Sequence, residues 1–170
     1  MGAEYFSVYQ DGTAVEHAFR DAVEDAEYEH GHGGYTGTIA EKRFYKVVAQ
    51  TPMSLDEAEE YASKLVVGED ALLADKCGPA GAIPVLTDRR RVRIVIPETR
   101  QGFKTKEEAA IVALKQSGDL KEGEKPAYGI QGMYRTHPRS GYLVSGELDV
   151  PLAGGPLEHR GWLFFGFASY

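Results

Sequence analysis

Nine consecutive residues, His30 to Thr38, hold the side chains whose types and spacing come nearest to a chemical site. Two histidines, a tyrosine and two threonines are interspersed there with four glycines. Glycine permits a positive φ or a close backbone approach, so the composition predicts a loop of defined shape with at least one glycine at positive φ. Binding residues are common on such loops. The candidate binding residues are His30, His32, Gly33, Gly34, Tyr35, Thr36 and Thr38.

The two histidines of this loop are the candidate metal ligands. His30 and His32 are two residues apart, so in extended backbone both imidazoles point to the same side. Zinc takes such nitrogen ligands together with carboxylates or further histidines. The side chains that would complete a set are Glu29, Glu41, His137 and His159. The alternative is that His30 interacts with a helix C-terminus and His32 is simply exposed, so we predict no cofactor and keep a divalent metal as the alternative.

Other reactions have weaker support in the sequence. A phosphate-binding loop precedes a helix, whereas these glycines follow a helical segment and precede a strand-like one. No Gly-x-Ser-x-Gly nucleophile motif occurs. Cys77, the single cysteine, has a basic neighbour in Lys76 but no histidine partner that the sequence identifies. His17 and Asp21 form an i,i+4 pair without a nucleophile, so we assign no catalytic residue.

A basic segment follows in the second half of the chain. Residues 1–87 carry 6 basic and 16 acidic side chains, a net charge of −10, while residues 88–170 carry 13 and 10, a net charge of +3. The run from Arg89 to Lys106 is therefore a candidate nucleic-acid contact. Two of its arginines alternate with apolar residues, as they would on the outer face of an amphipathic strand. Because the whole chain is acidic, nucleic acid is the least favoured partner.

Length and composition are those of one soluble domain. With 170 residues, 42% of them hydrophobic and 26% charged, the chain is long enough to bury its own core. We expect a single domain over residues 1–170. No apolar run approaches the roughly 20 residues that cross a bilayer, and the first residues lack a signal-peptide pattern. A lone cysteine fits a reducing compartment, so we expect a cytoplasmic protein without membrane contact.

Three helices are predicted from capping boxes, in which a Ser or Thr is followed three residues later by Glu. The boxes begin at Thr13, Ser54 and Thr105, and apolar residues recur behind each at helical spacing. We therefore expect helices to start within a few residues of 13, 54 and 105. Glycines at 31, 68 and 118 are placed to end them.

Strands are predicted where aromatic and β-branched residues alternate with polar ones. Residues 69–88 show no regular pattern, with a tight turn at 77–81. The predicted strands are residues 4–10, 43–49, 91–96, 128–134, 142–150 and 162–168. Because the last three strands have no helix between them, we expect an α+β fold with a mixed, largely antiparallel sheet and about three helices packed on one side.

The C-terminal strand suggests assembly. Residues 162–168 carry large apolar side chains on both faces. At a sheet edge, such a strand would expose one apolar row, which soluble proteins avoid. Either the strand is central and covered on both sides, or it meets another chain. The opposite charges of the two chain halves would also steer copies together, so a homo-oligomer is predicted against the alternative of a monomer with a central last strand.

A longer motif around the glycine loop resembles a known group of proteins. It consists of His-Gly-Gly-Tyr-Thr-Gly-Thr-Ile-Ala-Glu-Lys at 32–42, after an acidic amphipathic helix, and Asp75-Lys-Cys-Gly-Pro-Ala-Gly-Ala-Ile83. This pattern resembles a group of uncharacterised small proteins of actinobacteria and their tailed phages, over about the first half of the chain. The resemblance implies a phage or accessory-genome origin, and hence the host cytoplasm. That group has no known activity, so the resemblance implies no catalytic residue.

Three functions remain at this point. The favoured interpretation is a non-catalytic binding or assembly module that contacts a protein partner or a second copy of itself. The first alternative is a small metal-dependent enzyme with its site at residues 30–38. The second alternative is nucleic-acid binding through residues 89–106.

Overall fold

The computed structural model describes residues 2–170, apart from the side chain of Glu69. Its contacts divide the chain into two compact units, residues 2–87 with 158–170 and residues 88–157. Each unit has a sheet and a hydrophobic core of its own. The second unit is thus an insertion between two strands of the first. The expected single domain stays a prediction, for which an experiment is given below.

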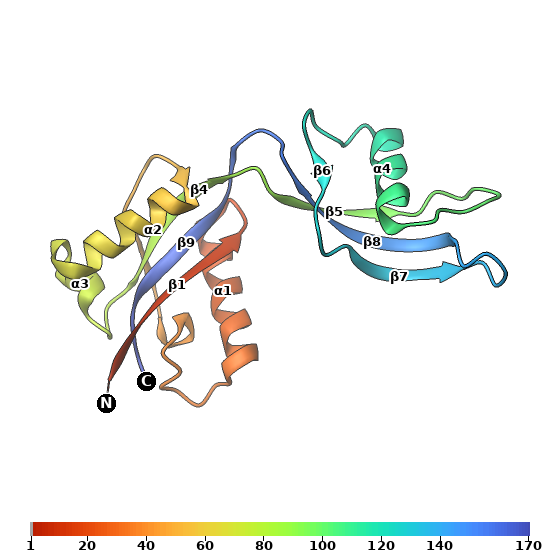
Figure 1. Ribbon diagram of the computed structural model, residues 1–170. Coiled ribbons are helices and arrows are strands. Elements are labelled where there is room, and N and C mark those ends of the chain that lie inside the picture. Colours follow the sequence, from red (N-terminus) through yellow and green to blue (C-terminus); the bar gives the residue numbers. More distant parts are fainter. Residues whose placement is uncertain (1) are drawn as a thin grey trace. The chain divides into compact units, whose positions relative to one another are not determined.

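The first unit is built on a five-stranded sheet with the last strand at its centre (Figure 1). The strands are β1 (Ala3–Asp11), β2 (Tyr45–Val47), β3 (Met53–Ser54), β4 (Ala80–Thr87) and β9 (Glu158–Ser169). Their order is β1-β9-β4-β2, and β3 also pairs with β4. β9 is antiparallel to both β1 and β4, whereas β2 and β3 are parallel to β4. The sheet is therefore mixed, and β1 forms one of its edges.

Helices cover both faces of this sheet. They are α1 (Val15–His30), α2 (Leu55–Lys64), α3 (Ala71–Ala74), the 3-10 turn η1 (Ile39–Glu41) and the short irregular helix η2 (Leu65–Glu69). One core cluster joins α1 to one face of the sheet, and a second joins α2, η2 and α3 to the other. The α+β class is confirmed, but the placement of about three helices on one side is wrong, because α1 and α2 lie on opposite faces.

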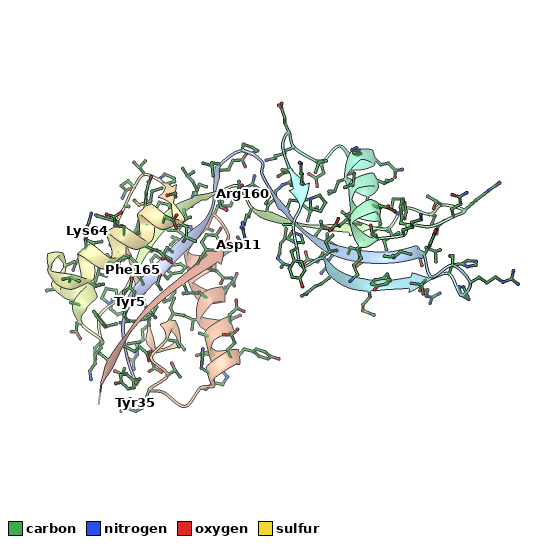
Figure 2. All side chains as sticks on the ribbon, in the orientation of Figure 1. Tyr5, Asp11, Tyr35, Lys64, Arg160 and Phe165 are labelled. Carbon is green, nitrogen blue, oxygen red and sulfur yellow. The ribbon has the colours of Figure 1, made fainter. Side chains whose placement is uncertain are left out.

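The C-terminal strand β9 is buried on both of its faces. Phe164 points to the α1 side, where its ring centroid lies 5.5 Å from that of Phe19. Phe165, labelled in Figure 2, packs among the residues of the α2 side. Both phenylalanines are completely buried. Of the two alternatives for this strand, the central position is therefore the observed one. Its apolar faces are covered within the same chain and give no further reason for assembly.

The sequence pattern did not predict β4, a central strand that contains Pro84. Proline lacks an amide hydrogen and is normally excluded from a central strand. The amide of Ala80 donates to the Phe44 carbonyl on the β2 side, and alternate residues of a strand point their amides to the same side. The Pro84 nitrogen therefore faces the gap between β2, which ends opposite Ala82, and β3, which begins opposite Val85. No ladder hydrogen bond is lost there.

The second unit is a four-stranded antiparallel sheet with one helix. Its elements are β5 (Arg90–Val95), α4 (Lys106–Ser117), β6 (Lys125–Pro126), β7 (Gln131–Thr136) and β8 (Leu143–Ala153). β8 is central, with β5 on one side and both β6 and β7 on the other. α4 packs on one face of the sheet over a separate apolar core. No other helix of the second unit packs on the opposite face, and all six residues of β7 are exposed.

Two of the three predicted caps form as expected. Helices α1, α2 and α4 begin at Val15, Leu55 and Lys106, so all three predicted starts are confirmed. The Ser54 hydroxyl accepts a hydrogen bond from the Glu57 amide, and the Thr105 hydroxyl accepts one from the Glu108 amide. These bonds satisfy amides that a helix N-terminus leaves without partners.

The predicted cap at Thr13 is wrong. The capping residue of α1 is Ala14, which has no side-chain cap. Instead, the Thr13 carbonyl accepts a hydrogen bond of 3.0 Å from the indole nitrogen of Trp162 on β9. This contact joins residues 149 positions apart, and local pattern carries no sign of it.

Candidate functional site

The glycine-rich loop after α1 has the specified shape that its composition predicts. Gly31, Gly34 and Gly37 have φ values of 85°, 74° and 70°. Tyr35 has a φ of 60°, which is uncommon for a residue with a side chain. The prediction of at least one glycine at positive φ is confirmed. The loop therefore contains four residues with positive φ between α1 and η1.

A carboxylate organises the second half of this loop. One oxygen of Glu41 accepts hydrogen bonds of 3.0 Å from both the amide and the hydroxyl of Thr36. The Thr36 hydroxyl also lies 2.8 Å from that of Thr38, which accepts from the Ala40 amide. The hydrogen bond from the Thr36 amide is the main reason why the pKa of Glu41 lies below its ordinary value. The candidate residues Thr36 and Thr38 are thus joined by a structural network.

The same loop is fastened to the end of the central strand. The Gly37 amide donates to the Ser169 carbonyl at 2.8 Å, next to the side chains of Glu4 and Tyr170. A Cβ on Gly37 would lie 2.6 Å from a Glu4 oxygen. Glycine is therefore required here for close approach as well as for φ.

The two histidines lie apart from that network. The side chains of His30 and His32 are 50% and 79% exposed, and their nearest carboxylates are Glu29 at 3.8 Å and Glu27 at 3.5 Å. Over residues 2–170, no group of three or more His, Cys, Asp and Glu side chains is gathered in a metal-binding arrangement. Neither His137 nor His159 is brought to this loop as part of such a group. The metal alternative therefore receives no support from the geometry and stays a prediction.

Lys42 is a buried charged residue that sequence reasoning missed. Only 4% of it is exposed, and its Nζ donates to the carbonyls of Lys76 and Gly78 at 3.0 and 2.9 Å. Burial lowers the pKa of this amine, while Asp75 and Cys77 raise it. An amine held by two backbone carbonyls fastens the turn at 75–79 to the unit. Nothing in the sequence distinguishes it from an exposed lysine.

Beside the loop, a groove runs between β1 and α1. We call it the β1 groove, and its volume is about 490 Å³. It includes two of the candidate residues, His30 and Thr38. Its remaining lining residues are Tyr5, Phe6, Ser7, Val8, Tyr9, Gln10, Ala22, Asp25, Ala26, Glu29 and Ile39. The groove thus has an apolar floor, a strand backbone along one side and carboxylates along the helix.

The edge of β1 that borders this groove has free backbone groups. The Gly12 amide donates to the Arg160 carbonyl. The backbone amides and carbonyls of the even-numbered residues of β1 therefore point toward β9, and those of the odd-numbered residues point away from it. Within residues 2–170, β1 pairs with β9 alone. The amides and carbonyls of Tyr5, Ser7 and Tyr9 therefore point away from the sheet. Sequence pattern could indicate the strand but not which of its edges stays open.

Negative charge flanks this edge on both sides. Asp25 and Glu29 lie along the α1 side of the β1 groove. On the α2 side, burial raises the pKa of the Tyr5 phenol and the charge of Glu59 adds to that shift. The first unit as a whole has 7 basic and 17 acidic side chains, a net charge of −10. The edge therefore lies in a negative field.

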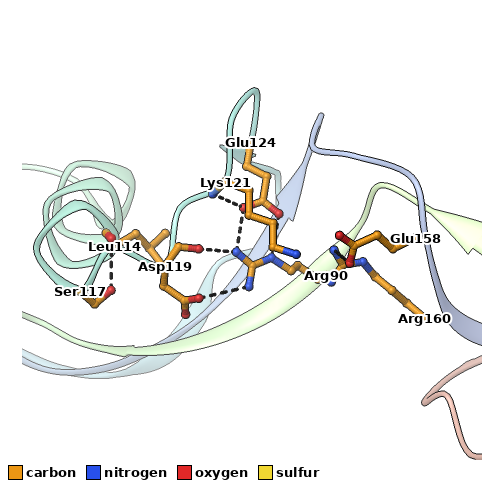
Figure 3. A network of polar contacts seen from close by, with 8 residues as sticks. All are labelled: Arg90, Leu114, Ser117, Asp119, Lys121, Glu124, Glu158 and Arg160. Carbon is orange, nitrogen blue, oxygen red and sulfur yellow. Dashed lines mark hydrogen bonds and ion pairs between the residues drawn. The ribbon is translucent and has the colours of Figure 1, made fainter.

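The candidate nucleic-acid segment, Arg89 to Lys106, has its charges partly engaged within the second unit. Arg90 forms a two-pronged ion pair with Glu124, at 2.7 and 2.8 Å (Figure 3). Arg91 pairs with Asp149 across the sheet at 2.5 Å. These pairs neutralise two arginines of the segment and so weaken its positive charge. Nucleic-acid binding stays the least favoured prediction.

Comparisons of the chain with models of protein families, with curated proteins and with solved structures find no match. The resemblance to the actinobacterial and phage group therefore stays a prediction. Among the helices of residues 2–170, none combines the length and apolar character that crossing a membrane requires.

Proposed function

We propose that this protein is a small non-catalytic module of phage or accessory-genome origin, acting in the cytoplasm, that binds an extended basic segment of a protein along the open edge of β1. One observation carries the proposal: an edge strand of nine residues borders an acidic groove with an apolar floor. An extended segment that pairs with such an edge adds a strand to the sheet.

The backbone of β1 supplies affinity without regard to sequence. Three outward residues, Tyr5, Ser7 and Tyr9, offer amides and carbonyls to a partner strand. Exposed edges of this kind normally pair, or are blocked by proline, lysine or a bulge. β1 contains neither proline nor lysine, and its register with β9 is continuous over nine residue pairs. The edge is therefore fit for pairing.

The groove supplies selectivity. Side chains of an added strand point alternately to the two faces of the sheet, and those on the α1 side enter the β1 groove. There, Asp25 and Glu29 favour arginine or lysine, while Phe6 and Ala22 favour an apolar neighbour. A segment in which basic and apolar residues share one face fits this arrangement.

The test uses a synthetic peptide with the repeat Arg-Thr-Val-Thr as the probe, in which arginine and valine alternate along one face of the extended chain. We expect the amide NMR signals of Tyr5, Ser7 and Tyr9 to shift on titration, with an affinity that weakens in salt. Ser7→Pro removes one outward amide and leaves the ladder with β9 intact, and should weaken binding about fivefold.

The control is the same peptide with glutamate in place of each arginine, and it should not bind. If the largest shifts fall outside β1 and α1, or if the Ser7→Pro variant binds as the wild type does, the proposed function is wrong.

A further inference from the structure

A second edge strand, β7 in the second unit, has the properties that the β1 groove selects. All six of its residues are exposed, and no helix of the second unit covers its outer face or its free edge. The Ile96 amide donates to the Gly146 carbonyl. The backbone amides and carbonyls of the even-numbered residues of β8 therefore point toward β5, and those of the odd-numbered residues point toward β7. In β7, the residues whose backbone amides and carbonyls point away from β8, to the free edge, are therefore Gly132, Tyr134 and Thr136.

The outer face of β7 combines an apolar with a basic side chain. Met133 and Arg135 are two residues apart and share one face. Met133 is 87% exposed, which is unusual for so large an apolar side chain on a surface strand. Arg139 follows in the turn to β8, and the second unit has 12 basic and 9 acidic side chains, a net charge of +3.

We propose that β7 of one copy of this chain adds to the free edge of β1 of a second copy. This inference rests on the proposed function and names its partner. The backbone groups at the free edge of β7 then form hydrogen bonds with those of Tyr5, Ser7 and Tyr9 on β1. Met133 then contacts the apolar floor of the β1 groove, and Arg135 lies against Asp25 and Glu29.

The flanking helices permit this pairing. α4 lies on the same face of its sheet as Tyr134. The Nζ of Lys106, at the start of α4, lies over the Tyr134 ring, 5.2 Å from its centroid. Met133 and Arg135 occupy the opposite face, which no helix of the second unit covers. When that face turns toward α1 of the second copy, α1 covers it without meeting α4. The opposite net charges of the two units steer the encounter.

The contact is heterologous, because it joins two different surfaces. Copies linked in this way close into a ring when the rotation permits and otherwise continue as an open chain. The expected sign is a weight-average mass that rises above 18.6 kDa with concentration and falls as salt is added. Analytical ultracentrifugation at micromolar concentration measures both effects.

Charge reversal tests the pairing residue by residue. Glu29→Lys and Arg135→Glu should each give a monomer. An equimolar mixture of the two variants should assemble again, because each reversed surface then meets an opposite charge. Glu24→Lys is the matched control: it makes the same change of charge on an exposed residue of α1 outside the β1 groove, and should assemble as the wild type does.

The possible outcomes separate the inference from the proposed function. A monomer at every concentration, with the arginine–valine peptide still bound at β1, overturns the inference alone. Assembly that neither Glu29→Lys nor Arg135→Glu affects also overturns it. Failure of both assembly and peptide binding overturns the inference and the proposed function together. Restored assembly in the mixture, with Glu24→Lys unaffected, supports the inference.

Discussion

The side chain of Glu124 is completely buried and its carboxylate is held by hydrogen bonds within the second unit. Arg90 provides two hydrogen bonds, and the Lys121 amide provides a third at 2.9 Å (Figure 3). Arg90 also donates to the Asp119 carbonyl. Chiefly through Arg90, the pKa of Glu124 falls from 4.5 to about 2. The pair joins β5 to the connection between α4 and β6.

Removing this charge should weaken the second unit. Glu124→Gln leaves Arg90 with a reduced set of acceptors in a largely buried position, and should lower the free energy of unfolding by about 3 kcal/mol. Because the folded pKa lies below the ordinary value, the stabilisation is complete above about pH 4.5 and is lost as the pH falls through about 2. Urea denaturation of both proteins between about pH 2 and pH 4.5 measures this loss of stability.

The neighbouring Glu122→Gln is the control, since Glu122 is exposed. Its stability should follow that of the wild type at every pH. A Glu124→Gln variant with the wild type's acid sensitivity would show that other carboxylates dominate acid unfolding.

At the scale of elements, the loop between α1 and η1 offers a matched pair of adjacent glycines. A Cβ added to either Gly33 or Gly34 would meet no atom within 4 Å, but only Gly34 has a positive φ, at 74°. Gly34→Ala should therefore destabilise by about 1 kcal/mol, whereas Gly33→Ala should change stability by less than about 0.5 kcal/mol. Thermal unfolding compares them. Equal effects would mean that the left-handed backbone does not specify this loop.

At the scale of the whole molecule, the second unit enters and leaves the first at paired residues. Thr87 at the end of β4 is the register partner of Glu158 at the start of β9. Replacing residues 88–157 by Asn-Gly should therefore turn β4 and β9 into a hairpin, because this dipeptide favours the turn that joins adjacent antiparallel strands. The shortened chain should unfold cooperatively and keep the Trp162 fluorescence of the buried indole.

The same experiment tests the expected single domain. A shortened chain that folds shows that the first unit is independent of the insertion. A chain that stays unfolded shows that the two units form one cooperative domain over residues 1–170. Assembly through β7 must be absent from the shortened chain in either case.

Most of the elements follow from the amino-acid sequence alone. Period-two and helical patterns are local, which explains why the helix starts at Val15, Leu55 and Lys106 and the strand at 91–96 are recovered. Capping is local too, and it forms at the last two of these helices. The glycine loop is also local in origin, because φ at Gly34 and Gly37 depends on the residue type.

How these elements meet depends on tertiary contacts. Pro84 is tolerated in β4 because two other strands leave a gap beside it, and the Thr13 carbonyl accepts a hydrogen bond from Trp162. The burial of Lys42 and Glu124 likewise depends on partners distant in sequence. Whether β1 or β9 is the edge is a matter of pairing order, which side-chain periodicity does not encode. The candidate site changed accordingly, from the glycine loop alone to the strand edge beside it.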